Sequence, residues 1–558
     1  MDEDYLGKKP LLLACEPVSL LVIGLRLAES RAAEDWKPVF AGFRELRECS
    51  ADGLRARLRR LRGKAGPYRI QIAGRHCRAP RHAQTKEPRT MSGLFGVVSE
   101  GDCWKHLFYG TDYQSHLGTE FGGLATAGPD GITRRIHTIS QAQFKSRFYD
   151  EQPHLPGRMG IGVISASEPQ PMMLLSRFGE FAVCMDGVIA NREALVAELH
   201  SMGVAFGDPV RGRVNSAELV ARLISLGDGI VDGIQKMFAR VQGAVSVLVL
   251  TPEGVYAARD RFGHSPLVVG AGSGAVAVAT ESTAFPNLGL EIKRFLLPGE
   301  IVHLTAQGFE LRAPGAQDDQ ICSFLWIYAG FPASHYEHIS VERVRERCGM
   351  ALASNDDVEA DFVSGVPDSG IAHAIGYAMG RKIPYRRPLV KYTPGYGRSY
   401  TPPSQEIRDL VAKMKLVPIA DVIRGSRIVV CDDSIVRGTQ LKNLTVRKLW
   451  ENGARAVHVR IACPPLMFPC RYNISIRALD ELAARRAIHA IEGRDLRDPA
   501  EVAPYIDPAS EKYRQMVAWL ANDLTVTSLK YQTLADMVSC IGLPAEKLCT
   551  YCWTGQGT

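Results

Sequence analysis

The chain has 558 residues, 46% of them hydrophobic and 23% charged, and a formal net charge of +7 at pH 7. This length indicates roughly three or four average domains, or two large ones. The modest positive charge suits an enzyme of phosphorylated substrates but does not indicate a nucleic-acid partner. No run reaches the ~18 apolar residues of a membrane span. The thirteen cysteines are scattered in a chain without a convincing secretory signal, so we expect a cytoplasmic protein with reduced thiols, a few of them metal ligands.

The first 90 residues differ from the rest of the chain. From Arg55 to Arg89 they are rich in arginine and show little apolar periodicity, although a small helical hairpin fits residues 41–61. We interpret residues 1–90 as a gene-start artefact with translation beginning at Met91. Lys86-Glu87 can be encoded as AAGGAG, a ribosome-binding sequence, and three codons separate it from Met91. A targeting peptide and a basic interaction arm are the competing interpretations.

The segment that begins at Ser92 opens with SGLFGVV, which predicts a short buried strand, and continues through Tyr113–Leu124, YQSHLGTEFGGL. These runs resemble the opening of the class II glutamine amidotransferases. The resemblance implies an N-terminal-nucleophile αββα sandwich, two stacked sheets between helices, over residues 91–320. In that family a cysteine at the mature N-terminus attacks glutamine, and its own α-amine is the base. The matching catalytic position here is Ser92.

Three features of glutamine hydrolysis in that family are altered here. Serine is a nucleophile in related hydrolases, so Ser92 alone decides little. However, Gly160–Pro171, which matches the family's glutamine-clamping segment, contains no arginine. The family's Asn-Gly oxyanion pair reads Asp186-Gly187, and an aspartate there puts a negative charge beside a developing oxyanion. Losing one oxyanion donor costs ~10²–10³ in rate and losing a nucleophile ~10⁶, so we expect glutamine hydrolysis to be absent.

The remainder of this segment predicts ordinary secondary structure with a structural role only. Apolar runs predict strands at 244–251 and 254–259, and residues 260–267 and 297–300 predict turns. Residues 215–226, NSAELVARLISL, have the spacing of an amphipathic helix.

Residues from about 335 to 475 alternate strand and helix patterns, as a doubly wound α/β sheet does. The most specific run is Ile428–Gln440, IVVCDDSIVRGTQ. Its apolar strand ends at Asp432 and Asp433, and a Gly/Ser/Thr loop then leads into a helical run. Paired acids at such a position can hold ribose hydroxyls or Mg²⁺, and loop amides with a helix N-terminus can hold a phosphate. An acidic turn with no ligand is the alternative.

This run resembles the phosphoribosyl pyrophosphate (PRPP) loop of type I phosphoribosyltransferases, and its SIVRGT resembles the purine-pathway amidophosphoribosyltransferases. The resemblance implies a type I phosphoribosyltransferase domain at residues 321–485. Ser369, in the turn Pro367-Asp-Ser-Gly370 between a strand at 360–366 and a helix at 371–380, would hold Mg²⁺ with the two acids. The implied PRPP contacts of the loop are Asp432, Asp433, Ser434, Val436, Arg437, Gly438 and Thr439.

The basic stretch Lys391–Leu416 contains glycine and proline and is unlike a core element. It resembles the family's mobile loop that closes over PRPP, with a solvated basic loop as the alternative. The implied pyrophosphate contacts are Lys391, Arg398, Arg408, Lys413 and Lys415.

Four cysteines resemble the ligands of amidophosphoribosyltransferases that carry a [4Fe–4S] cluster: Cys322, Cys470, Cys549 and Cys552. Four-thiolate clusters require a cysteine at each position, and a structural Zn²⁺ held by the same thiolates is the rival. Cys463 and Cys540 are interpreted as core thiols. Residues 486–558 are assigned to a C-terminal helical segment that begins with an insertion at Glu492–Ser510.

A departure from the family follows Cys322, where Leu325, Phe331 and Ala333 replace charged residues. Because this segment lies between the two domains, we expect the coupling between their sites to be altered.

The resemblance covers about residues 91–555 and implies a glycosyltransferase. Displacement of pyrophosphate from C1 of PRPP by ammonia would give 5-phosphoribosylamine, the first step of purine biosynthesis. The ammonia would be free or would come from a partner protein. A non-catalytic PRPP-binding regulatory paralogue and a transferase for another amine are the alternatives. We also expect a homo-oligomer.

Overall fold

The computed structural model describes residues 11–16, 21–26, 92–315, 319–392, 416–472 and 478–556. Two compact units divide the chain, Met1–Glu87 and Pro88–Thr558. In the first unit, strands β1 (Leu11–Glu16) and β2 (Leu21–Arg26) pair antiparallel. The helical hairpin predicted at residues 41–61 lies outside the described residues. Within the described ranges, no helix is both long and apolar enough to cross a membrane.

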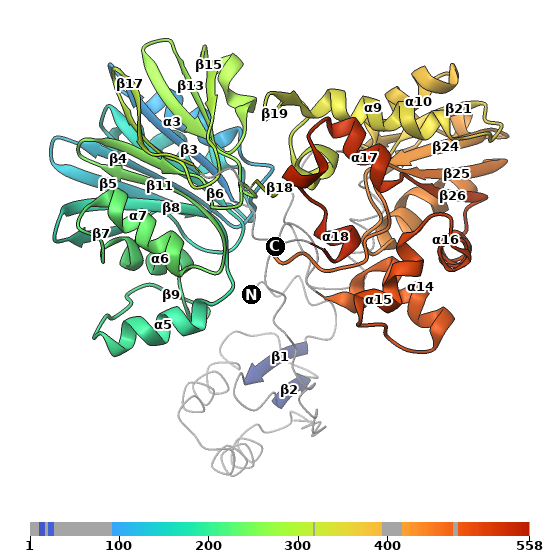
Figure 1. Cartoon of the computed structure of the whole chain (residues 1–558), viewed down its shortest axis with the longest axis horizontal. Coiled ribbons are helices and arrows are strands. Elements are labelled where there is room, and N and C mark those ends of the chain that lie inside the picture. Colours follow the sequence, from blue (N-terminus) through green and yellow to red (C-terminus); the bar gives the residue numbers. More distant parts are fainter. Residues whose placement is uncertain are drawn as a thin grey trace. The chain divides into compact units, whose positions relative to one another are not determined.

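The second unit begins with two antiparallel sheets, drawn in blue to yellow-green in Figure 1. One sheet has seven strands in the order β15-β13-β14-β3-β6-β4-β5, and the other has six in the order β17-β16-β12-β11-β8-β7. The strands of the first sheet are β3 (Gly93–Ser99), β4 (Phe121–Gly128), β5 (Gly131–Thr138), β6 (Met159–Ser165), β13 (Val268–Gly272), β14 (Ala275–Ala279) and β15 (Glu291–Phe295). Those of the second are β7 (Met172–Ser176), β8 (Gly179–Ile189), β11 (Gly243–Thr251), β12 (Gly254–Ala258), β16 (Ile301–Thr305) and β17 (Gly308–Ala313).

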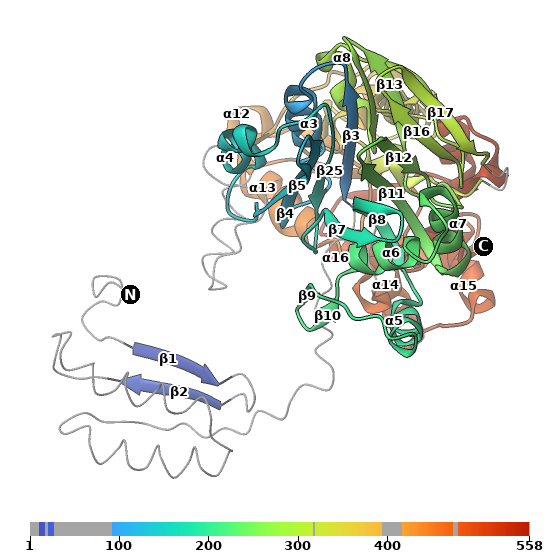
Figure 2. The ribbon, with the colours of Figure 1, turned by 90° about the vertical axis from the view of Figure 1, so that its left-hand side faces the viewer.

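Alternation along β3 shows why the layers stack as they do. Leu94 and Val98 belong to the core between the sheets, whereas Phe95 and Val97 belong to the core under the helices, because successive side chains of a strand point to opposite faces. Figure 2 shows these layers from the side. The helices over the seven-stranded sheet are α3 (Trp104–Asp112), α4 (Phe144–Phe148) and α8 (Phe285–Leu288); those over the six-stranded sheet are α5 (Arg192–Ser201), α6 (Ser216–Ile224) and α7 (Ile230–Arg240). The predicted αββα sandwich is confirmed.

Helix α6 coincides with the amphipathic run predicted at residues 215–226. Asn215 is its N-cap, and the Asn215 side chain accepts a hydrogen bond from the amide of Ala217 at 2.8 Å. Such a cap satisfies one of the first-turn amides that have no acceptor within the helix. The helix therefore starts where the sequence predicts.

A four-stranded parallel sheet forms the core of the second domain, in the order β21-β24-β25-β26. Its strands are β21 (Phe362–Gly365), β24 (Arg427–Asp432), β25 (Ala456–Ile461) and β26 (Ser528–Tyr531). Helices α9 (Val341–Ser354) and α10 (Ile371–Arg381) pack against each other within this core. The predicted α/β domain is present, and the near-continuous burial of β24 is typical of a central parallel strand.

One strand of this sheet comes from a part of the chain assigned to helices. Strand β26 lies beyond residue 485, in the predicted C-terminal helical segment. Its sequence, SLKY, is too short to show a strand pattern, and pairing with β25 through Leu529 and Tyr531 determines its conformation. The predicted insertion at Glu492–Ser510 contains helix α15 (Pro499–Ile506).

Further elements lie between these strands and helices and in the C-terminal part of the chain. They are the π-helices η5 (Leu325–Ala329) and η6 (Leu441–Val446), strands β18 (Ile321–Cys322), β19 (His335–Tyr336), β20 (Ile339–Ser340), β22 (Leu389–Lys391), β23 (Leu416–Pro418) and β27 (Leu548–Cys549), the 3-10 helix η7 (Leu479–Glu481), and helices α12 (Ala420–Ile423), α13 (Arg447–Glu451), α14 (Ala483–Glu492), α16 (Glu511–Asp523), α17 (Leu534–Ile541) and α18 (Tyr551–Thr554).

Candidate active site

Two adjacent carboxylates end the central strand of the parallel sheet. The amide of Asp433 donates to Oδ1 of Asp432 at 3.0 Å, and the hydroxyl of Ser434 donates to Oδ1 of Asp433 at 2.6 Å. From the neighbouring strand's turn, the hydroxyl of Ser369 donates to Oδ1 of Asp432 at 3.3 Å. The structure therefore brings together the three residues that the sequence assigns to a metal. They lie at the carboxyl edge of the strands, where ligands of parallel sheets bind.

Close packing of the Pro367–Gly370 turn against β24 holds Ser369 in this position. The amide of Val366 donates to the carbonyl of Cys431 at 2.9 Å. A Cβ on Gly370 would lie only 2.2 Å from the same carbonyl oxygen. Only glycine allows this approach, and the approach brings the hydroxyl of Ser369 to the acids.

Both acids are buried, with 9% of Asp432 and 4% of Asp433 exposed. Burial, with the charge of Asp433, raises the pKa of Asp432 well above its ordinary value. Burial also raises the pKa of Asp433, against hydrogen bonds from Ser369 and Ser434 and the charge of Arg345. Two carboxylates and a hydroxyl form the all-oxygen set that Mg²⁺ prefers, and a cation beside them would favour their charged forms. The donor set fits a magnesium ion.

The loop after the acids leads directly into a helix. Helical backbone begins at Thr439, so the first amides of this helix have no acceptors within it and form an anion site. Gly438 has a φ of +75°, a left-handed conformation that glycine adopts without strain. Its carbonyl accepts from the amide of Lys442 at 2.9 Å. This geometry is suited to holding a phosphate.

A later segment fixes the same loop from outside. The carbonyl of Val436 accepts from the amide of Ala483 at 2.7 Å, and that of Arg437 accepts from Arg486 at 2.7 Å. The side chain of Arg437 pairs with Glu481 at 2.5 Å. Sequence reasoning missed Glu481, Ala483 and Arg486, because helix α14 and the turn before it carry no motif.

Lys391, one of the predicted pyrophosphate contacts, lies at the end of β22. Its Nζ is 2.5 Å from Oδ2 of Asp368, and both side chains are exposed. Asp368 precedes Ser369, so this cation lies beside the turn that carries the hydroxyl. The other predicted contacts, Arg398, Arg408, Lys413 and Lys415, lie outside the described residues.

The first domain has a different buried carboxylate at its predicted catalytic position. The amide nitrogen of Ser92 donates to Oδ1 of Asp186 at 2.6 Å, and both residues are buried. Burial raises the pKa of Asp186 to about 6, although hydrogen bonds from Ser92 and Ser265 oppose the rise. Asp186 and Gly187 pair with Ser246 and Val245 across the β8–β11 ladder. The three predicted positions therefore lie together.

The turn predicted at residues 260–267 supplies polar groups close to Asp186. Asp260 accepts from the amides of Ser265 at 2.8 Å and Phe262 at 3.0 Å. The hydroxyl of Ser246 donates to the carbonyl of Ser265 at 2.8 Å. This turn was expected to be structural only; Ser265 also contacts Asp186, which its sequence did not reveal.

Comparison with known proteins decides the family. Residues 157–287 match the glutamine amidotransferase domain family. The chain is 31% identical to the amidophosphoribosyltransferase of Synechocystis over 84% of this chain and 91% of that protein. It is 30% identical to that of Methanocaldococcus jannaschii over 84% of this chain and 97% of that protein. The chain belongs to the amidophosphoribosyltransferase family.

A solved structure of this family agrees along most of the chain. The glutamine PRPP amidotransferase of B. subtilis, complexed with ADP and GMP, aligns with a TM-score of 0.71 and 28% identity over 83% of this chain and 96% of that one. The predicted fold class, an N-terminal-nucleophile sandwich followed by a type I phosphoribosyltransferase domain, is confirmed. So is the prediction of a glycosyltransferase, since the family transfers phosphoribosyl groups.

The four cysteines that match cluster ligands of amidophosphoribosyltransferases come from three separate segments. Strands β18 and β27 pair in parallel and put Cys322 opposite Cys549. Burial, followed by the charges of Cys549 and Cys470, raises the pKa of Cys322 well above its ordinary value. A hydrogen bond with Cys470, then burial, does the same to the pKa of Cys552. Cys322 and Cys552 are buried, and Cys470 and Cys549 are partly buried.

Contacts of the last residues hold this region together. The carbonyl of Cys552 accepts from the amides of Met467 and Phe468, at 2.9 and 3.0 Å. The rings of Phe324 and Trp553 stack with centroids 5.0 Å apart. Within the described part of the chain, no group of three or more His, Cys, Asp or Glu side chains has the arrangement of a metal-ion site. Cys463 and Cys540 are buried, as expected of core thiols.

Proposed function

We propose that this protein transfers the phosphoribosyl group of PRPP to ammonia, forming 5-phosphoribosylamine and pyrophosphate at the first step of purine biosynthesis. The observation that carries the proposal is the grouping of Asp432, Asp433 and Ser369 beside a helix N-terminus. The names of the relatives support it. A PRPP-binding regulator would need the same pocket, so turnover has to be tested directly.

Each part of the pocket has a proposed role in the transfer. The loop amides and the hydroxyl of Thr439 bind the 5-phosphate, and Asp432 and Asp433 orient the ribose hydroxyls. Lys391, which pairs with Asp368 beside Ser369, contacts the departing pyrophosphate. Cleavage at C1 passes through an oxocarbenium-like transition state, as in glycoside hydrolysis. When bound by the two acids and Ser369, Mg²⁺ neutralises charge on the departing pyrophosphate.

The nitrogen comes from ammonia because glutamine hydrolysis is lost. Asp186, which the resemblance matches to the family's oxyanion asparagine, accepts a hydrogen bond from the amide of Ser92. Should the mature chain begin at Ser92, its α-amine would occupy the position of this amide nitrogen. A carboxylate 2.6 Å away favours the protonated amine, which cannot act as a base. The nucleophile would therefore lack activation even after processing.

We also propose that Cys322, Cys470, Cys549 and Cys552 hold a [4Fe–4S] cluster. The proposal is supported by the chemistry of the donor set: the cluster requires four thiolates, and these four cysteines, two buried and two partly buried, affect one another's pKa. The absorbance spectrum and iron content of anaerobically purified protein test the assignment, with Cys463→Ser as a buried-thiol control for Cys549→Ser. We expect a brown protein that loses iron only in Cys549→Ser. Stoichiometric zinc in colourless protein would assign the rival site instead.

Pyrophosphate release from PRPP and Mg²⁺ tests the function, with ammonium and glutamine supplied in separate reactions. We expect release with ammonium and none above background with glutamine. PRPP binding without release would make the protein a regulator, and glutamine-driven release would contradict the loss of the glutaminase. An ammonia-supplying partner, a homo-oligomer and a cytoplasmic location stay predictions.

A further inference from the structure

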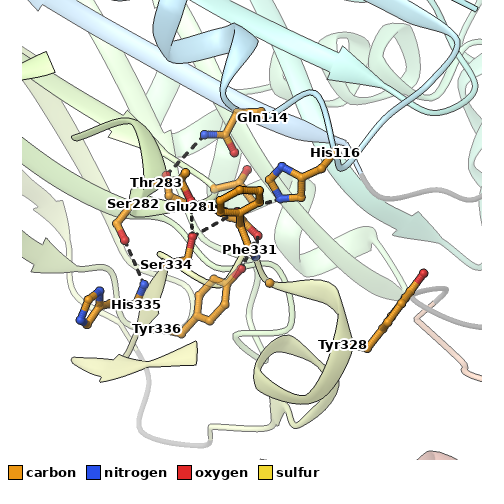
Figure 3. Close-up of polar contacts among 12 residues, drawn as sticks. Gln114, His116, Glu281, Ser282, Thr283, Tyr328, Phe331, Ser334, His335 and Tyr336 are labelled. Atoms are coloured by element: carbon orange, nitrogen blue, oxygen red, sulfur yellow. Dashed lines mark hydrogen bonds and ion pairs between the residues drawn. The ribbon is translucent and has the colours of Figure 1, made fainter. Parts of the chain in front are cut away.

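A buried carboxylate of the amidotransferase-like domain forms the centre of the network in Figure 3. Glu281 follows β14 and is fully buried. Its carboxylate accepts from the hydroxyl of Tyr336 at 2.5 Å, from that of Ser334 at 3.2 Å, and from the amide of Phe331 at 3.2 Å. Nε2 of His116 lies 2.8 Å from the carboxylate. A buried carboxylate with this many donors is held firmly in one position.

The charge of His116 and the hydrogen bonds to the carboxylate both favour the ionised form of Glu281. Burial opposes ionisation, but the contacts with His116, Tyr336 and Phe331 hold the pKa of Glu281 below its ordinary value. Removing one partner from such a site leaves a buried charge uncompensated, which is strongly destabilising. The network therefore has one preferred arrangement.

The donors come from two parts of the chain. His116 belongs to the amidotransferase-like domain, in the turn after α3, whereas Phe331, Ser334 and Tyr336 belong to the segment that leads into the transferase domain. The centroids of the Phe331 and His116 rings are also 5.1 Å apart. Phe331 is one of the positions where this chain departs from the charged residues of its family, and here it joins the two parts.

The same segment is held on its other side by a buried arginine of α9. The guanidinium of Arg345 donates to the carbonyls of Trp326 at 2.9 Å, Tyr328 at 3.1 Å and Gly330 at 2.7 Å. These are carbonyls of η5 and its C-terminus, immediately before Phe331. Arg345 is only 3% exposed, so these carbonyls take the place of water as partners of its guanidinium.

Arg345 is linked through η5 and α10 to the turn that carries Ser369. Nδ1 of the His373 ring lies 3.1 Å from the carbonyl oxygen of Arg345, and Nε2 lies 3.4 Å from that of Ile327 in η5. His373 lies in α10, which begins directly after Ser369.

We propose that Arg345 is a positioning residue for the acid pair, and that Glu281 of the amidotransferase-like domain fixes Arg345 through the segment 331–336. The domain would then be needed for PRPP binding although it hydrolyses no glutamine. The proposal rests on the proposed function only in taking the acid pair as the PRPP site. A purely structural network would change stability and leave affinity for PRPP unaltered.

Calorimetric titration of the full chain with PRPP and Mg²⁺ tests the proposal, with thermal unfolding measured in parallel. Arg345→Met should weaken PRPP binding about 10- to 100-fold, as loss of an outer partner of a metal site does, and Arg345→Lys should retain part of the affinity. Glu281→Gln and Tyr336→Phe should weaken binding roughly 3- to 10-fold, the scale of coupling between distant residues. Arg343→Met on the same helix and Glu291→Gln in the same domain, both exposed, should bind like the parent.

A double variant shows whether Glu281 affects PRPP binding through Arg345 or independently of it. Glu281→Gln combined with Arg345→Met should bind PRPP no more weakly than Arg345→Met alone, because coupled residues are not additive. Folded Arg345→Met with parental affinity would overturn the proposal, as would full additivity. If Arg345→Met does not fold, Arg345→Lys and Tyr336→Phe decide by the same criterion. A parent chain that does not bind PRPP would instead contradict the proposed function.

Discussion

The two predicted sites of this chain both contain buried aspartate at the strands of a sheet, yet their surroundings differ. Asp186 contacts its own domain's backbone and the hydroxyl of Ser265. Asp432 and Asp433 adjoin two hydroxyls, an arginine charge and the start of a helix. In the first arrangement, groups of the same domain provide the hydrogen bonds of the carboxylate. In the second, the neighbouring groups are suited to binding a cation and a phosphate.

This difference shows what a carboxylate needs in order to be catalytic. Negative charge beside a developing oxyanion opposes acyl transfer, whereas the same charge beside a departing pyrophosphate recruits the metal that stabilises it. Under the proposed function, the chain keeps both folds, and only the transferase pocket keeps groups that match its chemistry.

The largest effect should follow neutralisation of the acid pair. Asp432→Asn and Asp433→Asn each remove a proposed magnesium ligand, and we expect kcat/KM for PRPP to fall by about 100-fold or more, the scale of losing one electrostatic stabiliser. Steady-state pyrophosphate release measures the change. Asp421→Asn, an exposed acid on α12, serves as the control, and near-parental rates in both acid-pair variants would remove the contrast between the sites.

A smaller loss should come from the phosphate loop. Gly438 and Gly425 have φ values of +75° and +73°, so alanine strains the backbone by ~1–3 kcal/mol at either position. Only Gly438→Ala should also weaken PRPP binding, by about tenfold, because only Gly438 is in the loop that is proposed to hold the phosphate. Parallel titrations and unfolding curves compare the two variants. Equal affinities would show that the loop's conformation is unimportant for binding.

Asp186 should affect stability rather than turnover with ammonium. With its pKa raised to about 6, the folded chain binds this proton more tightly than the unfolded chain does. Its stabilising contribution is therefore present below about pH 4 and is lost as the pH rises toward 6. Asp186→Asn should thus raise the melting temperature more at pH 7.5 than at pH 4.5, relative to the parent. Asp130→Asn, on an exposed turn, is the control, and a pH-independent difference would contradict the assignment.

The smallest effect is expected at the former nucleophile. Ser92→Ala should leave ammonium-driven pyrophosphate release within about twofold of the parent. Ser92→Cys should gain no glutaminase activity, because Asp186 remains at the position that the resemblance assigns to an oxyanion donor. Glutamate formation from glutamine measures the second variant. Substantial glutamate from Ser92→Cys would show that the pocket needs only its thiol.

Local sequence patterns predicted the elements whose ends are marked by particular residue types. Ile428–Gln440 was identifiable because an apolar run ends in two acids and continues through a glycine loop, and the cap at Asn215 marked the start of α6. The grouping of Ser369 with Asp432 was implied by the family resemblance alone; in the fold the two residues meet because the carboxyl ends of parallel strands lie at one edge of the sheet.

Residues whose role depends on distant partners could not be predicted in this way. Glu281 and Arg345 look like ordinary surface charges in the sequence, and only the fold buries them among carbonyls and hydroxyls from other segments. Strand β26 has too few residues to show alternation, so its pairing with β25 is what defines it. The role of Ser265 was missed for the same reason.

One reaction tests the central contrast directly. The full chain is incubated with PRPP, Mg²⁺, unlabelled ammonium and glutamine labelled with ¹⁵N in its amide, while ³¹P and ¹⁵N resonances are followed in the same tube. We predict that pyrophosphate accumulates while the labelled amide of glutamine stays constant. A fall in the glutamine amide in step with pyrophosphate, or the absence of pyrophosphate altogether, would contradict an active transferase pocket joined to a silent glutaminase.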